Sequence, residues 1–321
     1  MDATPPADRI AAAAYGGAGW SPRTATHAQE IGTLWADAAI DSEWRKLARV
    51  ALRRPGAELA VPEVNAAQHI APIDPGRAAA EHDRLTECYR AAGVGVIEVP
   101  DVPAPTPNRM FCADLFVATP QGAILARPAS TVRAGEEMAV AAGLAAAHVP
   151  ILATLTGTAT FEGADLMWLD AETALIGRGL RTNDEGIRQI TARLADIGCT
   201  AIAVDMPVGT MHLMGILRIV DRDLAIARTR MTPLRAVTEL RARGIAVAFL
   251  PETDGADADV AMNVVTLGPR RILMPAGCPT FHAWYEGLGI DVTHTPMDEL
   301  RKAAGAVGCL TGVVARERDG A

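Results

Sequence analysis

The hydrophobic and polar positions of the chain follow one unit that recurs at intervals of about 45 to 55 residues. Each unit reads as two β-type runs around a tight turn, an amphipathic helix and a third β-type run. In the clearest copy, LMWLD and TALIGRG flank the turn AE, and TAIAVDM closes the unit. The helix between them carries Ile187, Ile190 and Leu194 at helical spacing. Asn183 is expected to cap its start, and Gly198 to end it in a left-handed conformation.

The same pattern can be followed through the rest of the chain. One copy contains HLMGILRIV, LAIART, a helix over 233–243 and IAVAFL. Another contains NVVTLG, RRILMP, a helix near Phe281 and IDVTHTP, and an upstream copy contains DLFVATPQGAILARP, an alanine-rich helix and ILATL. The first copy is split, because RVALRRPG and GVGVIEVP lie early in the chain and CLTGVVARE would supply the missing strand from its end.

About five such modules would bury their faces against each other and close a ring, with the C-terminal strand as the clasp. We therefore predict an α/β fold in which residues 46–321 form a single domain. Residues 1–45 are expected to be an N-terminal extension, rich in tryptophan, that serves as a lid or an oligomer contact. An ordinary open α/β sheet is the alternative that the pattern leaves open.

Composition and charge narrow the class of protein. The chain has 321 residues, 50% of them apolar, and a formal net charge of -8 without a lysine or arginine run, which argues against a nucleic-acid or anionic-membrane surface. The uncharged stretch 138–161 is divided by His148 and Pro150, so we expect a buried helix and strand there rather than a membrane span. No signal-peptide pattern is evident, and the cytoplasm is the expected location.

The five cysteines are an odd and sparse set without CxxC spacing, which argues against both a disulfide framework and a zinc site. No phosphate-binding loop, dinucleotide fingerprint or metal-binding motif is found, so we expect neither a cofactor nor a metal.

Chemically related residues stand where each module begins. They are Asp114, Glu162 with Asp165, His212, Asn263 and Cys309. A ring would bring these module starts to one centre, which is how catalytic sites are commonly assembled from distant positions. A thiol beside an imidazole can act as a nucleophile, and two carboxylates can hold a planar, fork-shaped cation. The implied partner is a small molecule that carries a guanidinium or amidine group.

At these positions the sequence resembles the guanidino-group-modifying enzymes, which include arginine deiminases, dimethylarginine dimethylaminohydrolases and amidinotransferases. The resemblance covers roughly residues 46 to 317 and rests on FEGAD, RTNDEG, MHL, PAGCP and GCLTG. It implies a five-bladed pseudo-symmetric α/β propeller of ββαβ modules. By motif position it implies Cys309 as nucleophile, His212 as general acid and base, Glu162 and Asp114 as guanidinium-holding carboxylates, and Arg133 and Arg181 as residues that grip the substrate's α-carboxylate.

One position departs from the family pattern. In the deiminases and amidinotransferases an Asp follows two residues after the catalytic His, but Met214 stands there in this chain. An apolar side chain fits an N-substituted guanidine better, which favours the dimethylarginine dimethylaminohydrolase branch. The alternatives are an amidinotransferase that moves the amidino group to an amine, and a guanidinium-binding protein without turnover. A homodimer is the default expectation for the assembly.

Several residues keep a second, purely structural interpretation. Asp165 is expected either to contact the substrate or to brace the turn in FEGAD. Asn263 is read as a backbone-bonding amide rather than a catalytic group, and Arg133 and Arg181 as either substrate ligands or ordinary charges. Cys112 is expected to share a strand face with Asp114, and there to be inert or to line the pocket.

Overall fold

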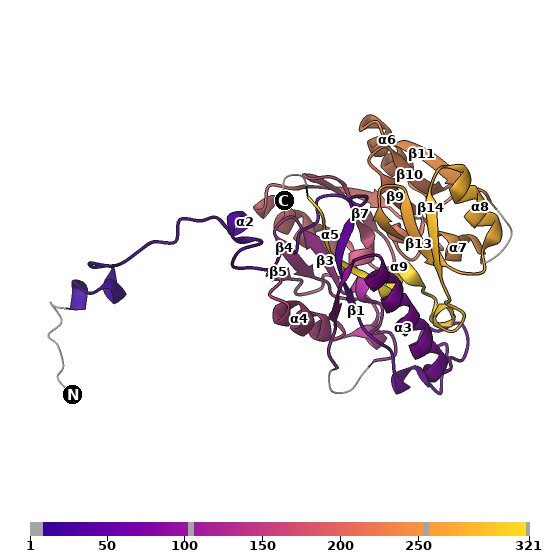
Figure 1. Cartoon of the computed structure of the whole chain (residues 1–321), viewed down its shortest axis with the longest axis horizontal. Coiled ribbons are helices and arrows are strands. Elements are labelled where there is room, and N and C mark those ends of the chain that lie inside the picture. The colour runs from indigo at the N-terminus through magenta and orange to yellow at the C-terminus, as the bar shows by residue number, and fades with distance from the viewer. Residues whose placement is uncertain (1–8, 102–105, 253–256, 319–321) are drawn as a thin grey trace.

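The strands of this protein are grouped into five sheets of the same design. The computed structural model describes residues 9–101, 106–252 and 257–318 (Figure 1). Within these residues the strands form five three-stranded sheets. In each sheet a middle strand pairs antiparallel with one neighbour and parallel with the other. The five sheets are the blades of an α/β propeller, so the prediction of a ring of modules is confirmed and the open-sheet alternative is wrong.

The blades share one strand order. The antiparallel first strands are β3 (Phe116–Thr119), β6 (Leu166–Asp170), β9 (Leu217–Asp221), β12 (Val265–Gly268) and β15 (Gly312–Arg316). The middle strands are β1 (Leu47–Leu52), β4 (Gly122–Leu125), β7 (Thr173–Arg178), β10 (Leu224–Arg228) and β13 (Arg271–Pro275). The outer strands are β2 (Gly95–Glu98), β5 (Ile151–Thr154), β8 (Thr200–Asp205), β11 (Ala246–Leu250) and β14 (Asp291–Thr295).

A helix crosses over between the middle and outer strand of every blade. These helices are α3 (Pro75–Ala91), α4 (Glu137–Ala146), α5 (Asp184–Asp196), α6 (Leu234–Ala242) and α8 (Pro279–Gly287). Parallel pairing requires such a crossover, because a tight turn can join only antiparallel neighbours. Short 3₁₀ segments also occur at η2 (Ala57–Leu59), η4 (Thr131–Arg133) and η7 (Leu300–Ala303).

The C-terminal strand closes the ring. β15 pairs with β1 from the other end of the chain, with Val313 opposite Val50. Strand β15 also contacts β3 of the next blade, and β12 contacts β9 and β1. The predicted clasp is therefore present, and it completes the split first blade.

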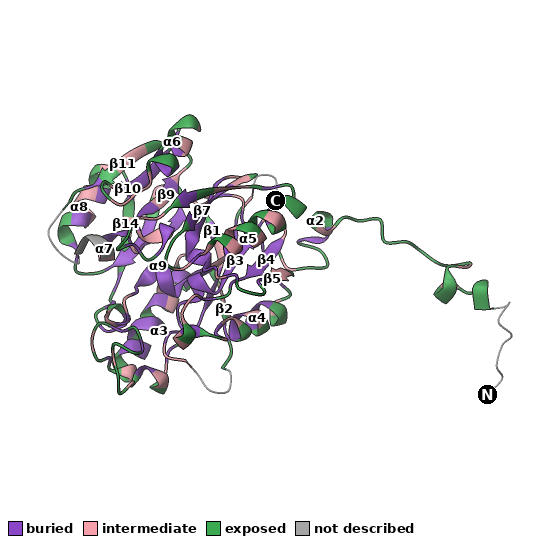
Figure 2. Cartoon of the chain, turned by 180° about the vertical axis from the view of Figure 1, so that it is seen from behind, coloured by how far each residue is buried: buried purple, intermediate pink, exposed green. Residues whose placement is uncertain are grey.

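Burial falls from the middle of each blade to its edge, as Figure 2 shows in purple, pink and green. The middle strand β4 is buried at every position, whereas the outer strand β5 is exposed at both ends. Middle strands accordingly read as continuous apolar runs. Trp168 of β6 is 1% exposed and donates its indole N–H to the Ala118 carbonyl in the neighbouring blade, so blade faces are joined by packing and by hydrogen bonds.

Helix α5 has the start and end that its sequence predicts. The Asn183 side-chain oxygen accepts the Gly186 N–H at 2.8 Å, and Gly198 adopts φ 80° just beyond the helix. The same oxygen accepts the Thr160 N–H at 3.0 Å, so Asn183 also fixes the loop before β6.

Replacing Asn183 with alanine should therefore cost about 2 kcal/mol in the free energy of unfolding, at the upper end for a lost cap because a second backbone donor also loses its partner. Asn183→Asp keeps the acceptor oxygen and should lose less. Urea unfolding of the two variants measures the difference. Equal stability of Asn183→Ala and the wild type would show that the cap contributes nothing.

The N-terminal segment leaves the body of the protein (Figure 1). Described residues before α2 (His27–Glu30), with η1 (Ala13–Tyr15), run outward, and Tyr15 and Trp20 are exposed. Nearer the first strand the segment packs on the blades. Ala38 and Ile40 are buried there, and the backbone N–H of Trp168 donates to the Glu43 carboxylate. None of the described helices has the length and apolar content needed to cross a bilayer.

Candidate active site

Single helical turns precede the first strands and gather at one place. They are η3 (Cys112–Asp114), η5 (Gly163–Asp165), η6 (Leu213–Gly215) and α9 (Val307–Leu310). Turn η3 contacts η5 and α9, and η5 contacts η6. A Cβ on Gly163 would overlap the carbonyl oxygens of Phe116 and Ala113, so the glycine in FEGAD permits this close approach.

Two expectations about these turns are wrong. Cys309 was expected at the start of the last strand, but it lies in the short helix α9, and β15 begins only at Gly312. Cys112 and Asp114 were expected to share a strand face, but both lie in the 3₁₀ turn η3, where residues two apart point in different directions. Cys112 is fully buried, and burial raises the pKa of its thiol to about 12.

Asn263 fixes the position of Cys309. It follows α7 (Asp257–Met262), and its side-chain oxygen accepts the backbone N–H groups of Gly308 at 2.7 Å and Cys309 at 3.2 Å. Its amide nitrogen donates to Cys309 Sγ at 3.1 Å. Asn263 thus bonds the backbone, as the sequence suggested, and also contacts the thiol.

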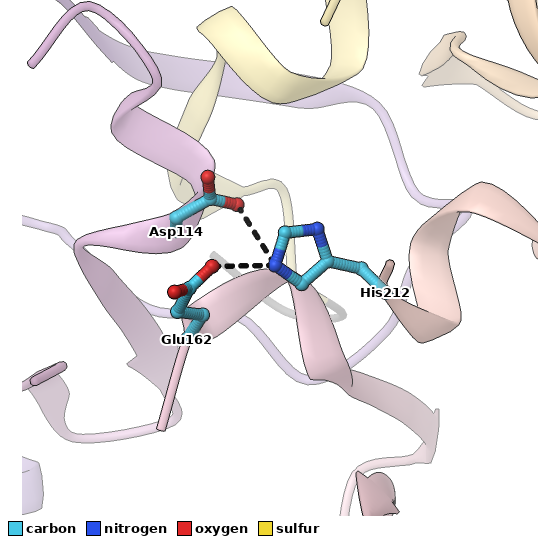
Figure 3. A group of neighbouring side chains, drawn as sticks. All are labelled: Asp114, Glu162 and His212. Atoms are coloured by element: carbon cyan, nitrogen blue, oxygen red, sulfur yellow. Dashed lines mark hydrogen bonds and ion pairs between the residues drawn. The ribbon is translucent and has the colours of Figure 1, made fainter. Parts of the chain in front are cut away.

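Asp114, Glu162 and His212 form a buried cluster, drawn in Figure 3. His212 Nε2 donates to Glu162 Oε2 at 2.6 Å and lies 3.7 Å from Asp114 Oδ1. Asp114 Oδ1 is buried and accepts no hydrogen bond, although its other oxygen is bonded to Arg133. An unpaired buried carboxylate oxygen is costly, so this atom is the natural acceptor for a donor group of a ligand.

The Asp165 side chain bonds two residues outside the FEGAD turn. One carboxylate oxygen accepts the Leu213 N–H at 3.0 Å, and the other accepts the Thr182 hydroxyl at 2.6 Å. Burial raises the pKa of Asp165 to about 6 against the opposing effect of these bonds and of His212. The residue therefore holds the backbone next to His212.

The two arginines differ in their surroundings. Arg133 is 3% exposed and donates to Asp114 at 2.6 Å and to Glu136 at 2.8 Å, while its Nη2 is buried without a hydrogen-bond partner. Arg181 lies 3.4 Å from Glu162. Both therefore belong to the carboxylate cluster, and Nη2 of Arg133 remains able to donate to an anion.

Proton positions at the site follow from burial and charge. Burial alone would lower the pKa of His212, but Asp114 and Glu162 outweigh it and raise that pKa to about 9. Burial opposes ionisation of Glu162, but the bond from His212 and the nearby arginines lower its pKa to about 2. At neutral pH this pair is an imidazolium with a carboxylate.

Cys309, in contrast, is favoured in its neutral form. Burial, followed by the charge of Asp114, raises the pKa of its thiol, although Asn263 and Arg218 act against this. The free site therefore holds a neutral thiol near a charged imidazolium at neutral pH. A cationic ligand that arrives beside the thiol would favour the thiolate.

Asp114, Glu162 and His212 are also residue types that can bind a metal ion. One potential ligand atom from each residue lies within 4.8 Å of the others. However, Nη1 of Arg133 lies 2.6 Å from Asp114 and 3.5 Å from Glu162, so a positive charge already contacts two of the three residues. The cluster fits an organic cation better.

Two hollows meet at Cys309. One is a polar recess, whose lining includes Asn108, Asp114, Arg133 and Arg181. The other is a largely apolar cavity of about 530 Å³, whose lining includes Ile70, Met214, Ile216, Met231, Val260 and Ala306, together with His212 and Asn263. Met211, Ala304, Gly305 and Cys309 border both. A ligand atom at the thiol can therefore carry one substituent into each hollow.

Arg218 of β9 is a neighbour of Cys309 that sequence reasoning missed. A Cβ on Gly308 would collide with Arg218 Nη2, so the guanidinium lies against the turn that carries Cys309. Nη2 is buried without a hydrogen-bond partner, and its charge lowers the thiol pKa. The available signal was a lone arginine within the apolar run GILRIV.

Replacing Arg218 with methionine should make Cys309 less reactive. Loss of the nearby positive charge raises the thiol pKa, and one pKa unit reduces the thiolate fraction at neutral pH about tenfold. The rate of Cys309 alkylation by iodoacetamide as a function of pH, followed by peptide mass spectrometry, measures this. Arg218→Lys keeps the charge and is the matched control. Identical profiles for Arg218→Met and the wild type would contradict the role.

The chain is similar in sequence to known proteins. The arginine deiminase family model matches residues 83–248, just over half of the chain, and the chain belongs to that family. A dimethylarginine dimethylaminohydrolase of Streptomyces coelicolor is 29% identical over 240 residues, which cover 74% of this chain and 86% of the relative. The corresponding Pseudomonas aeruginosa enzyme is 24% identical over 243 residues, 76% of this chain and 91% of the relative.

Solved structures share the fold. A serine variant of the Pseudomonas aeruginosa enzyme, complexed with citrulline, superposes with a TM-score of 0.70 at 22% identity over 83% of this chain and 98% of the other. The amidinotransferase SxtG of the saxitoxin pathway of Microseira wollei reaches 0.71 at 16% identity over 88% of this chain and 98% of the other.

Proposed function

We propose that this protein hydrolyses a C–N bond of a substituted guanidino group on an arginine-like amino acid, giving a ureido product and an amine. The observation that carries the proposal is the convergence of Asp114, Glu162 and His212 next to hollows that meet at Cys309. The curated relatives are dimethylarginine dimethylaminohydrolases, which supports the same reaction. Residues 46–321 are proposed as the catalytic domain, and a homodimer as the assembly.

In the first half of the reaction, the substrate guanidinium binds with its N–H groups toward Asp114 and Glu162. Its positive charge favours loss of the Cys309 proton to solvent, and the thiolate attacks the guanidinium carbon. A C–S bond forms. The bond to the leaving nitrogen then breaks as His212, which is protonated at rest, gives that nitrogen its proton.

In the second half, the covalent thiouronium on Cys309 is hydrolysed. His212, now neutral, takes a proton from a water molecule that attacks the same carbon. The C–S bond breaks, the thiolate returns, and the product carries the water oxygen as a urea group. Glu162 keeps His212 oriented throughout through the 2.6 Å bond to Nε2.

Met214 favours a substituted substrate over free arginine. It lines the apolar cavity, and a Cβ on Gly308 would lie 3.2 Å from its terminal methyl group, so it lies close to the nucleophile's turn. An N–H donor facing a thioether would lose a strong acceptor, whereas an alkyl group there loses nothing. Arg133 and Arg181 are proposed to grip the α-carboxylate from the polar recess.

The second candidate is an amidinotransferase, in which an amine replaces water at the thiouronium. The apolar cavity favours it, because the cavity gives an acceptor amine a place beside Cys309. The fold shared with SxtG is compatible with it.

Incubation with arginine, monomethylarginine, dimethylarginine and guanidino-acid analogues tests the proposal. Mass spectrometry should detect a ureido product from a substituted guanidine without any added amine. Product that appears only with an amine acceptor would favour the transferase. No product from any guanidine, with or without amine, would contradict both.

A further inference from the structure

The apolar cavity has no counterpart in the sequence argument, which gave only Met214 as an apolar neighbour of the guanidinium. We propose that this cavity is a subsite for the substituent on the leaving nitrogen, and that the substituent is a hydrocarbon group of several carbons. The proposal rests on the hydrolytic function proposed above and adds the class of substrate.

The position of the proton donor decides which side the leaving group takes. The leaving nitrogen must lie within reach of His212, and His212 borders the apolar cavity, whereas Asp114, Arg133 and Arg181 border the polar recess. Cys309 lies where the two hollows meet. The charged amino-acid part therefore faces the recess, and the substituent that departs as an amine faces the apolar cavity.

The chemistry of the cavity wall selects a hydrocarbon. Met214, Met231 and Ile216 present flexible thioether and alkyl surfaces, which adapt to apolar groups of varied shape. No carboxylate is found among the described residues that line the cavity. Two cationic residues also line it: Lys302, whose ammonium is bonded to Glu299, and Arg301, which is exposed to solvent. A second cation would have no partner there.

The size of the cavity favours an occupant larger than a methyl group. Its volume of about 530 Å³ lies in the range of pockets that enclose whole drug-sized ligands. A methyl or dimethyl group would leave most of that apolar wall in contact with water. Each further buried methylene should tighten binding about threefold to fourfold until the cavity is filled.

Binding of Nω-methyl-, Nω-propyl- and Nω-hexyl-arginine to Cys309→Ser protein, measured by titration calorimetry, tests the inference without requiring turnover. We expect the hexyl compound to bind at least about 30-fold more tightly than the methyl compound. Equal affinities, weaker binding of the longer compounds, or no binding by any of them would overturn it.

A substitution inside the cavity provides the structural control. A Cβ on Gly215 meets no atom within 4 Å, so a side chain can begin there without a clash; Gly215→Leu is the cavity-filling variant, and Gly215→Ala is the smaller matched variant. Both would be made in the Cys309→Ser protein. The hexyl-to-methyl affinity ratio should fall about tenfold with leucine and little with alanine. If Gly215→Leu does not fold, Met231→Phe takes its place, and an unchanged ratio in a folded cavity-filling variant would contradict the proposal.

Turnover of the same three compounds by wild-type protein separates this inference from the proposed function. Tight binding of the hexyl compound with no ureido product from any compound would support the subsite and contradict the proposed hydrolase function. Ureido product from the methyl compound, with affinity that falls as the alkyl substituent lengthens, would support the hydrolase function and contradict the subsite.

Discussion

Cys309→Ser protein is expected to lose ureido-product formation by about 10⁴-fold or more, because loss of a covalent nucleophile has effects of this order in other enzymes. A serine hydroxyl beside a protonated His212 has no base to activate it. Substrate binding should be retained, because the carboxylates and arginines proposed to hold the substrate are unchanged. Steady-state assay of product, with calorimetry for binding, measures the two effects separately.

Cys88→Ser is the matched control for this experiment. Cys88 lies in helix α3, is only partly buried and is a free thiol like Cys309. Its replacement should leave product formation within about twofold of the wild type, as is usual for substitutions away from special features. Activity retained in Cys309→Ser would assign the nucleophile to another group.

His212→Gln is expected to reduce kcat by about 10² to 10⁴, the range that general acid–base groups contribute. The loss should depend on the leaving group. An S-alkyl isothiourea analogue of the substrate releases a thiol that needs little protonation, so it should still load Cys309. The adduct should then persist, because no base activates water, and intact-protein mass spectrometry would detect it. If His212→Gln turns over a guanidine as fast as the wild type does, His212 is not the general acid and base.

The raised pKa of His212 gives the reaction a predicted pH dependence. Because Cys309 is a neutral thiol in the free site, kcat/KM should rise with pH through the neutral range. Because the His212 imidazolium persists above its ordinary range, kcat/KM should fall only as pH passes about 9. Glu162→Gln removes a carboxylate that stabilises the imidazolium, so the alkaline limb should move to lower pH. An alkaline limb unaffected by Glu162→Gln would show that it belongs to another group.

The fold could be predicted to a large extent because its signals are local and repeated. Gly198 ends α5 with a positive φ, Asn183 caps that helix, and the run CLTGVVARE contains the clasp strand β15. Each depends on spacing or on a single residue's backbone preference. Five agreeing copies of the module strengthened each local interpretation.

The wrong predictions arose where a side chain distant in the sequence fixes the backbone conformation. The turn around Cys309 reads as a strand entry in isolation, but Asn263, 46 residues away, accepts the N–H groups of Gly308 and Cys309 and holds them in helix α9. Arg218 escaped notice for the same reason, since its contact with that turn exists only after blades assemble. Local propensity carries no information about such contacts.

Peptide mapping after rapid acid quench would detect a covalent intermediate on Cys309. Wild-type and His212→Gln protein would be mixed with the substituted guanidine that gives most product, and with its S-alkyl isothiourea analogue. We expect one covalent amidino adduct, located on the peptide that contains Cys309, which decays in the wild type as ureido product appears. Product formation without an adduct on Cys309, or with the adduct on another residue, would contradict covalent catalysis by this thiol.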